Sequence, residues 1–268
     1  MSRHVRRRIV AVDADHPGGT TRLDELAVEE PLEIRLNGAP WMVTMRTPGR
    51  DVELVHGLLA AEGIIARVED VATARYPRAT FNVLDVRLAP GVALPATKVR
   101  ETVTTSACGI CGTRTIEELR QAMTFDVASD DVRVAGETLV GLPDALLAAQ
   151  RIFATTGGLH GVGLFTAAGE LLVAREDVGR HNATDKVLGW ALLNGRRPAH
   201  GLVLVVSGRT SFELAQKAAL AGVPVLAGVS APSSLAVEVA EAAGLTLAGF
   251  VRGDRMNLYA RPDRVVLS

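Results

Sequence analysis

The most distinctive chemistry in this chain belongs to its only two cysteines, Cys108 and Cys111. They lie in the stretch TTSACGICGTRT, residues 104–115, and a glycine follows each of them. Two thiols at this spacing interconvert readily with a disulfide, and a deprotonated thiol is also a nucleophile towards sulfur. Because the flanking glycines offer little apolar cover, we expect a reactive loop rather than a buried structural pair.

The elements on either side of this loop would position the thiols. VRETVTT, residues 99–105, is typical of a strand that leads into the loop. On the other side, Thr115 and Glu118 match a capping box, which predicts a helix that begins after Thr115. A helix N-terminus favours a thiolate, but its effect fades within about one turn, so we expect only modest assistance from the dipole.

Zinc binding is a weak interpretation of the cysteine pair. A closed zinc site needs about four ligands, and His160 and His181 are not spaced as a ligand pair. Zinc deaminases combine H-x-E with a later P-C-x-x-C, whereas this chain has no H-x-E and no proline before Cys108. Two interpretations stay open from the spacing alone: a dithiol oxidoreductase, and a sulfur relay that holds sulfane sulfur as a persulfide.

Composition indicates a folded globular protein. The chain has 268 residues, 48% of them hydrophobic, and a formal net charge of −1, which argues against coating nucleic acid. Its first residues, MSRHVRRRIVAV, contain too short an apolar run for an export signal, and no run of about eighteen apolar residues suggests a membrane span. We therefore expect a cytoplasmic protein without membrane or nucleic-acid partners, with a flexible N-terminal tail over residues 1–22.

The sequence predicts a β-rich N-terminal domain over residues 23–135, which ends in the C-x-x-C loop and its helix. Residues 32–45 alternate apolar and polar around Asn37-Gly38, the dipeptide typical of a tight hairpin. A helix is predicted over residues 51–61 with Gly63 beyond its end, and a strand in the stretch FNVLDVRL.

A second domain is predicted over residues 136–268, with regular α/β alternation in its later part. Three strands at 202–206, 224–229 and 245–251 alternate with helices at 211–221 and 233–243, which is typical of parallel strands with right-handed crossovers. Three further elements precede them: a helix opened by Pro143 and Asp144 and ended by Gly157-Gly158, a hairpin over 161–174, and a helix over 183–193 capped by Asn182.

Polar residues follow the predicted parallel strands, where ligands of such sheets bind. Ser207 and Arg209 follow one strand, and Arg252 and Arg255 follow another, which indicates an anionic ligand. His160, between glycines, is a further candidate. Five more polar residues either line this site or only anchor a helix, and the sequence leaves both interpretations open: Glu176, Asp177, Arg180, His181 and Asp185.

Several blocks together resemble one family, the formate dehydrogenase accessory sulfurtransferases, or FdhD family. The blocks are TSACGICG (105–112), GGLHGVGLF (157–165), REDVGRHNATDKVLGW (175–190), SGRTSFELAQKAALAGVPVLAGVSAPSSLAV (207–237) and GLTLAGFVRGDRMNLY (244–259). They cover most of the chain beyond residue 104, and the first hundred residues match more loosely. The resemblance implies a homodimeric cytoplasmic protein whose α/β C-terminal domain has a cytidine-deaminase-like fold without the zinc site.

The resemblance also implies a function. Members of the family take sulfur from a cysteine desulfurase and pass it to the molybdenum bis(molybdopterin guanine dinucleotide) cofactor of formate dehydrogenase. Cys108 matches the persulfide-forming cysteine and Cys111 its partner. The family's cofactor-binding stretch matches Phe250, Val251, Arg252, Gly253, Asp254 and Arg255.

The residue types in that stretch suit the implied cofactor. Arg252 and Arg255 suit its pyrophosphate, and Asp254 suits its guanine or forms an ordinary turn ion pair. Guanine nucleotides are expected to mimic the cofactor. The alternatives are a chaperone that binds the cofactor without passing sulfur, and a dithiol oxidoreductase.

Overall fold

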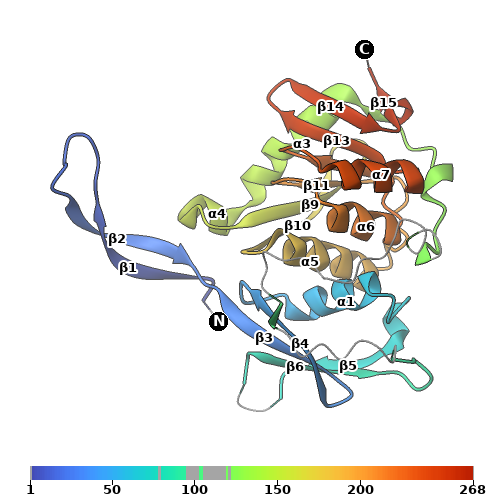
Figure 1. Ribbon diagram of the computed structural model, residues 1–268, viewed down its shortest axis with the longest axis horizontal. Helices are drawn as coiled ribbons and strands as arrows, with labels where there is room; N and C mark the ends of the chain where they lie inside the picture. The colour runs from blue at the N-terminus through green and yellow to red at the C-terminus, as the bar shows by residue number, and fades with distance from the viewer. Residues whose placement is uncertain (1, 78–79, 95–102, 105–118, 120–121, 268) are drawn as a thin grey trace.

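Two β-sheets with helices between them form the body of the protein (Figure 1). This computed structural model describes residues 2–77, 80–94, 103–104, 119 and 122–267. Cys108 and Cys111, the predicted capping residues Thr115 and Glu118, and most of the predicted strand at 99–105 lie outside the described residues. Among those that are described, no helix is both long and apolar enough to cross a bilayer.

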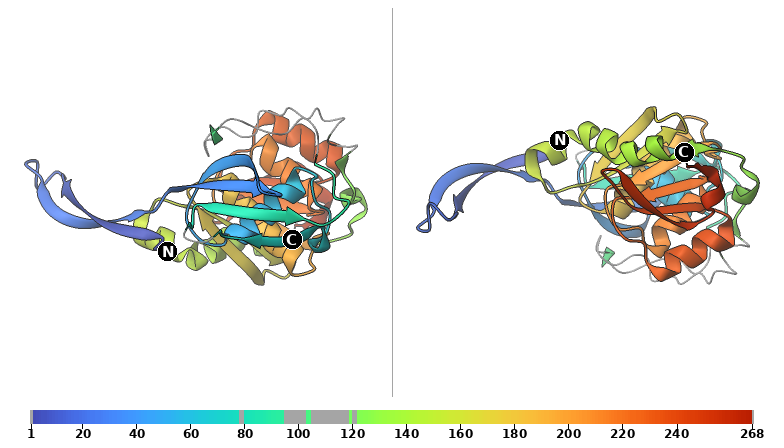
Figure 2. Two further views of the ribbon diagram at one scale, coloured as in Figure 1. Left: turned by 90° about the horizontal axis from the view of Figure 1, so that it is seen from below. Right: turned by 90° about the horizontal axis from the view of Figure 1, so that it is seen from above.

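A two-stranded hairpin projects from the body at the N-terminus (Figures 1 and 2). Strand β1 (His4–Ala11) pairs antiparallel with β2 (Thr20–Ala27), so an ordered hairpin replaces the tail predicted up to residue 22. Glu25 on β2 contacts Arg6 at 2.6 Å and His4 at 2.7 Å on β1. Arg6 and His4 therefore face a cross-strand carboxylate, which stabilises the pair of strands.

The N-terminal sheet has the strand order β5-β6-β3-β4-β7. Its strands are β3 (Glu30–Leu36), β4 (Ala39–Arg46), β5 (Val71–Arg75), β6 (Val83–Leu88) and β7 (Val103–Thr104). The predicted hairpin at Asn37-Gly38 is confirmed, with φ of 53° and 86° at these two residues. Helix α1 (Asp51–Ala61) packs Leu54 and Leu59 into the same core as strand residues of the sheet, and Gly63 follows its end with φ 71°.

The larger sheet has the strand order β10-β9-β11-β12-β13-β14. Its strands are β9 (His160–Thr166), β10 (Leu171–Asp177), β11 (Leu202–Val206), β12 (Val225–Gly228), β13 (Thr246–Arg252) and β14 (Arg255–Ala260). β11, β12 and β13 are parallel, and helices α6 (Phe212–Leu220) and α7 (Ser234–Ala243) connect them, as the sequence predicted.

Helices cover both faces of this larger sheet. Val203 and Val205 of β11 share a core with α3 (Gly136–Ala149), whereas Leu204 and Val206 share the opposite core with α6 and α7 and with α5 (Arg180–Leu193). This explains the uninterrupted apolar run of β11, because a strand covered on both faces has no solvent side. The expected α/β architecture is confirmed, and the likeness to cytidine deaminases stays a prediction.

Two predicted helix starts are wrong. α3 begins at Gly136 and contains Pro143, and it stops at Gln150 before a short helix α4 (Arg151–Thr156). The missing N–H of Pro143 does not end α3, because buried residues on both sides of it, Leu139 and Leu146, anchor the helix on the sheet.

The other helix, α5, begins at Arg180. Asn182 therefore lies inside the first turn, where its amide donates to the Met45 carbonyl at 2.7 Å instead of capping the helix.

A close helix crossing joins the two sheets into one layered body. α1 lies on α5, and a Cβ at Gly57 would overlap the Asp185 carbonyl, while one at Gly189 would overlap the Glu53 carbonyl. The end of the predicted N-terminal domain also packs with the C-terminal part, because β8 (Val134–Ala135) pairs with β15 (Val265–Val266). Short 3-10 turns lie at Val68–Asp70, Val127–Ser129 and Pro262–Arg264.

Candidate functional site

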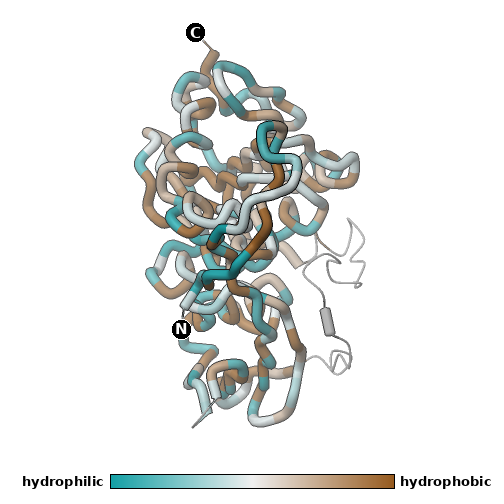
Figure 3. The backbone as a smooth tube through the Cα atoms, turned by 90° about the vertical axis from the view of Figure 1, so that its left-hand side faces the viewer, coloured by the Kyte–Doolittle hydropathy of each residue, from teal (hydrophilic) through white to brown (hydrophobic). Residues whose placement is uncertain are grey.

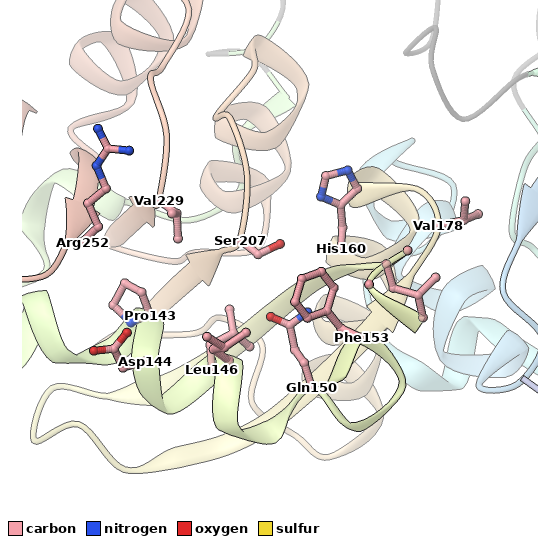
Figure 4. Close-up of a pocket in the computed structure, with 14 residues that line it drawn as sticks. Pro143, Asp144, Leu146, Gln150, Phe153, His160, Val178, Ser207, Val229 and Arg252 are labelled. Atoms are coloured by element: carbon pink, nitrogen blue, oxygen red, sulfur yellow. The ribbon is translucent and has the colours of Figure 1, made fainter. Parts of the chain in front are cut away.

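A cavity of about 470 Å³ opens at the carboxyl edge of the larger sheet (Figure 4). β11 and β13 end at this edge, and β9 begins there because it runs antiparallel to β11. Three predicted site residues line the cavity: His160, Ser207 and Arg252. In Figure 4, Ser207 lies between Arg252 and His160, and Val178 lies beyond His160. The fold thus brings together residues more than ninety positions apart, and Ser207 and Arg252 lie where the strand-end argument predicts.

The opposite wall of the cavity is largely apolar and comes from α3 and α4. Pro143, Leu146 and Phe153 contribute side chains, and Gln150 contributes an amide where the two helices meet. The sequence did not identify this wall, because it predicted one continuous helix whose apolar face was simply core. A cavity with an apolar wall and a few polar groups on the facing strand ends has the composition of a small-molecule site.

Ser207 is held by two hydrogen bonds to β9. Its Oγ accepts from the Gly161 N–H, and its own N–H donates to the Gly161 carbonyl, both at 2.9 Å. With Oγ positioned as an acceptor, the hydroxyl proton is free to point at a ligand oxygen in the cavity.

His160 is half-buried beside Ser207. Burial lowers the pKa of His160, and the nearby positive charge of Arg180 lowers it further, while Asp177 opposes the shift. A Cβ at Gly208 would lie 3.4 Å from His160 Nδ1, so the backbone after β11 passes close to the ring. The imidazole is therefore neutral at pH 7 and offers a ligand one donor and one acceptor.

The predicted stretch from Phe250 to Arg255 divides between the core and the surface. Phe250 has a φ of 53° in an irregular part of the β13–β14 pairing, and Arg252 lies 5.8 Å from its ring centroid. The side chain of Val251 is fully buried against α3, so only its backbone is open to a ligand. Gly253 and Asp254 are exposed in the turn before β14, and Arg255 is exposed as the first residue of β14.

An irregularity in β13 accompanies this division. Ala248 and Val251 pack into the same core although they lie three residues apart, and the pairing with β14 shifts between Gly249 and Arg252.

Arg209, the remaining predicted residue, is exposed just after β11 and is not among the residues that line the cavity. Its positive charge acts on Arg180. The arginines at the carboxyl edge of the larger sheet thus form two groups. Arg252 and Arg255 flank the turn between β13 and β14, whereas Arg209 follows β11 and Arg180 begins α5.

The sequence left open whether five polar residues line the site or anchor a helix. In the structure, three of them anchor helices. Glu176 accepts from the N–H groups of Ile152 and Phe153 at 3.1 and 2.7 Å and so caps α4. Asp177 is buried 2.6 Å from Lys186, and Asp185 is bonded to Lys217 at 2.8 Å. These are structural contacts.

The other two of these five polar residues are His181 and Arg180. His181 Nε2 lies 3.1 Å from Ser211 Oγ, and burial lowers the pKa of His181 to about 4. Arg180 is the exception, because its buried Nε has no hydrogen-bond partner among the residues that the structure describes.

In the part of the chain that the structure describes, no group of three or more histidines, cysteines or acidic residues is arranged to hold a metal ion. The basic side chains at the sheet edge, together with the apolar wall, instead suit an anionic organic ligand. Fold and site thus define an α/β protein with a cavity at the carboxyl edge of its larger sheet and basic side chains beside it.

Comparison with known proteins gives the family. A family model described as the FdhD/NarQ family matches residues 27–266. The sulfur carrier protein FdhD of Mycobacterium tuberculosis (strain ATCC 25618 / H37Rv) is 53% identical over 270 residues, which cover 97% of each chain. That of Streptomyces coelicolor is 53% identical over 257 residues, covering 92% of this chain and 91% of the relative. The chain belongs to the FdhD/NarQ family.

A solved structure shares the fold. A crystal structure from Desulfotalea psychrophila, described as that of a formate dehydrogenase accessory protein, matches with a TM-score of 0.78. The match covers 99% of this chain and 100% of the other, at 23% identity.

Proposed function

We propose that this protein is a sulfur carrier that serves the maturation of formate dehydrogenase in the cytoplasm. The observation that carries the proposal is the 53% identity, along 97% of the chain, to a protein named as a sulfur carrier. The C-x-x-C pair supports it, because the chain has no other thiol that could hold the sulfur.

The proposed transfer begins at Cys108. Its thiolate attacks the outer sulfur of a persulfide on a cysteine desulfurase, the donor's S–S bond breaks, and the donor cysteine leaves as a thiolate. Cys108 then carries the sulfur as its own persulfide. Attack of the Cys111 thiolate on Sγ of Cys108 would then break the persulfide S–S bond, release the outer sulfur as hydrosulfide to the acceptor and leave a Cys108–Cys111 disulfide, which a dithiol reductant must reduce before the next cycle.

The proposed acceptor is the molybdenum bis(molybdopterin guanine dinucleotide) cofactor, which is the substrate here. Arg252 and Arg255 would pair with its phosphoryl oxygens, and Ser207 and neutral His160 would donate hydrogen bonds. The apolar wall at Phe153 would contact a flat ring. In a homodimer, two such sites would be available to a cofactor that carries two guanine dinucleotides.

Replacing each cysteine by alanine tests the proposal. We expect Cys108→Ala to abolish activation of formate dehydrogenase while guanosine diphosphate still binds, because the thiol and the cavity are separate parts of the chain. The matched variant Arg252→Gln should instead weaken nucleotide binding and leave persulfide formation intact. Full activation by the Cys108→Ala, Cys111→Ala double variant would show a chaperone that passes no sulfur, and turnover of protein disulfides would show a dithiol oxidoreductase.

A further inference from the structure

Two arginines lie close enough to act on each other electrostatically, and Arg180 also acts on His160 of the cavity. Arg180 is the first residue of α5, and Arg209 follows β11. The Nε of Arg180 is buried and has no hydrogen-bond partner. Within the described residues, neither guanidinium forms an ion pair or a side-chain hydrogen bond.

This arrangement is electrostatically unfavourable without an anion. Burial lowers the pKa of Arg180, and the charge of Arg209 lowers it further, whereas Glu213 opposes the shift. Both guanidiniums carry a positive charge at neutral pH, so each disfavours the other. An anion bound between them would remove this repulsion.

The neighbouring carboxylates are already shared with other cations. Glu213 lies 3.5 Å from Lys217 and 3.6 Å from His181, and Asp185 is bonded to Lys217. Lys217 is matched by three carboxylates, because Asp185, Glu213 and Glu62 all raise its pKa, whereas Glu213 is the carboxylate that acts on Arg180. His181 adds no positive charge, because burial lowers its pKa to about 4 and keeps it neutral at pH 7.

The backbone adds to the positive potential at the same place. α5 begins at Arg180 and α6 begins after Ser211, and neither helix has a side chain that caps its first N–H groups. The contact between His181 Nε2 and Ser211 Oγ at 3.1 Å joins these two helix starts. The positive ends of two helix dipoles therefore lie beside the arginine pair.

We propose that Arg180 and Arg209 form an oxyanion subsite that takes a phosphate or pyrophosphate group. It adjoins the cavity at His160 and is separate from the Arg252 end. Two guanidinium forks suit phosphoryl oxygens, which accept parallel N–H donors. The inference rests on the proposed function in one respect: the dinucleotide cofactor is the nearest source of such a group, and free pyrophosphate is the other source.

Calorimetric titration of the full-length protein with inorganic pyrophosphate tests the subsite. We expect Arg180→Gln and Arg209→Gln each to weaken binding by about tenfold or more. Arg196→Gln, which changes an exposed arginine in the turn after α5, is the matched control and should bind like the parent protein. Because Arg209 is exposed, its variant should fold even if Arg180→Gln does not. Unchanged pyrophosphate affinity in a folded Arg209→Gln variant would overturn the proposal.

A second titration in saturating guanosine diphosphate identifies the source of the oxyanion. Loss of pyrophosphate binding would assign the subsite to the nucleotide's own phosphates, and retention would assign it to a separate anion. If the parent protein bound pyrophosphate but no guanine nucleotide, that result would contradict the guanine dinucleotide cofactor of the proposed function. It would still support an oxyanion subsite at Arg180 and Arg209. If the parent protein bound no pyrophosphate, the subsite itself would be refuted.

Discussion

His181 lies where α5 and α6 begin, and its environment keeps the ring neutral. It is buried, and Arg180 and Lys217 place positive charge near it, whereas Glu213 opposes the shift. Burial is the largest cause of the fall in its pKa to about 4. The unfolded chain would bind a proton at this histidine near its ordinary pKa of about 6.5, so protonation favours unfolding.

This difference predicts how stability depends on pH. As pH falls from 7.5 to 5, the unfolded state gains a proton at His181 that the folded state does not, so folding loses about 2 kcal/mol. Denaturant titrations at both values measure this loss. His181→Gln should lose about 2 kcal/mol less than the parent protein between the same two pH values. An equal loss in both proteins would show that another group causes the acid dependence.

Lys186 and Asp177 form a buried ion pair that links the two sheets. Lys186 Nζ lies 2.6 Å from Asp177 and donates to the Thr47 carbonyl at 2.9 Å, and Asp177 accepts from the Thr47 N–H at 3.1 Å. Burial raises the pKa of Asp177, and Lys186 opposes that rise. The pair is stable only while both partners are present.

Removing one partner should therefore destabilise the protein strongly. We expect Lys186→Met to cost about 3–5 kcal/mol, because it leaves a buried carboxylate without its cation. Arg35→Gln, which breaks an exposed pair with Glu33, should leave the unfolding free energy nearly unchanged. Denaturant unfolding at pH 7 measures both variants. If Lys186→Met also left the unfolding free energy nearly unchanged, the buried pair would not join the sheets.

Among the elements, the crossing of α1 over α5 holds the two sheets together. It depends on Gly57 and Gly189, where a side chain would overlap the backbone of the opposite helix. Neither glycine is in a left-handed conformation, so close approach is what each position requires.

An alanine scan of helical glycines tests this crossing. Gly57→Ala should destabilise the protein by several kcal/mol, about 3 or more, because backbone must move to admit the methyl group. Gly141→Ala on α3 is the matched control: nothing lies within 4 Å of its added Cβ, so helix propensity should stabilise it by up to about 1 kcal/mol. Thermal unfolding of both variants measures the difference. Equal stability of the two variants would contradict the close crossing.

For the molecule as a whole, local patterns in the sequence predicted much of the fold. The Asn37-Gly38 hairpin and the strand at 202–206 depend on turn chemistry and apolar runs within a few residues, and both are confirmed. The start of α3 at Gly136 and the place of Asn182 inside α5 depend on tertiary contacts, which local patterns do not record.

The candidate site, like the fold, has some features that local sequence predicts and others that depend on tertiary contacts. The strand-end rule predicted that Ser207 and Arg252 lie at one edge, and both line the cavity, because parallel strands end at one edge. His160 also lines it, but it begins the antiparallel strand β9 and was a candidate for its place between glycines. The rule did not identify the wall from α3 and α4, or that Arg180 faces Arg209, because those contacts join segments whose spacing carries no periodic signal. Cys108 and Cys111 lie outside the described residues, so their relation to the cavity stays a prediction.

Mass spectrometry of the protein after incubation with a cysteine desulfurase and cysteine tests the central claim most directly. The proposed sulfur transfer predicts a gain of one sulfur atom, which peptide mapping locates at Cys108 and which is lost in Cys108→Ala. The Cys108→Ala, Cys111→Ala double variant is the control for sulfur bound elsewhere. A parent protein that gains no sulfur, or that gains it equally in the double variant, would contradict the sulfur-carrier function.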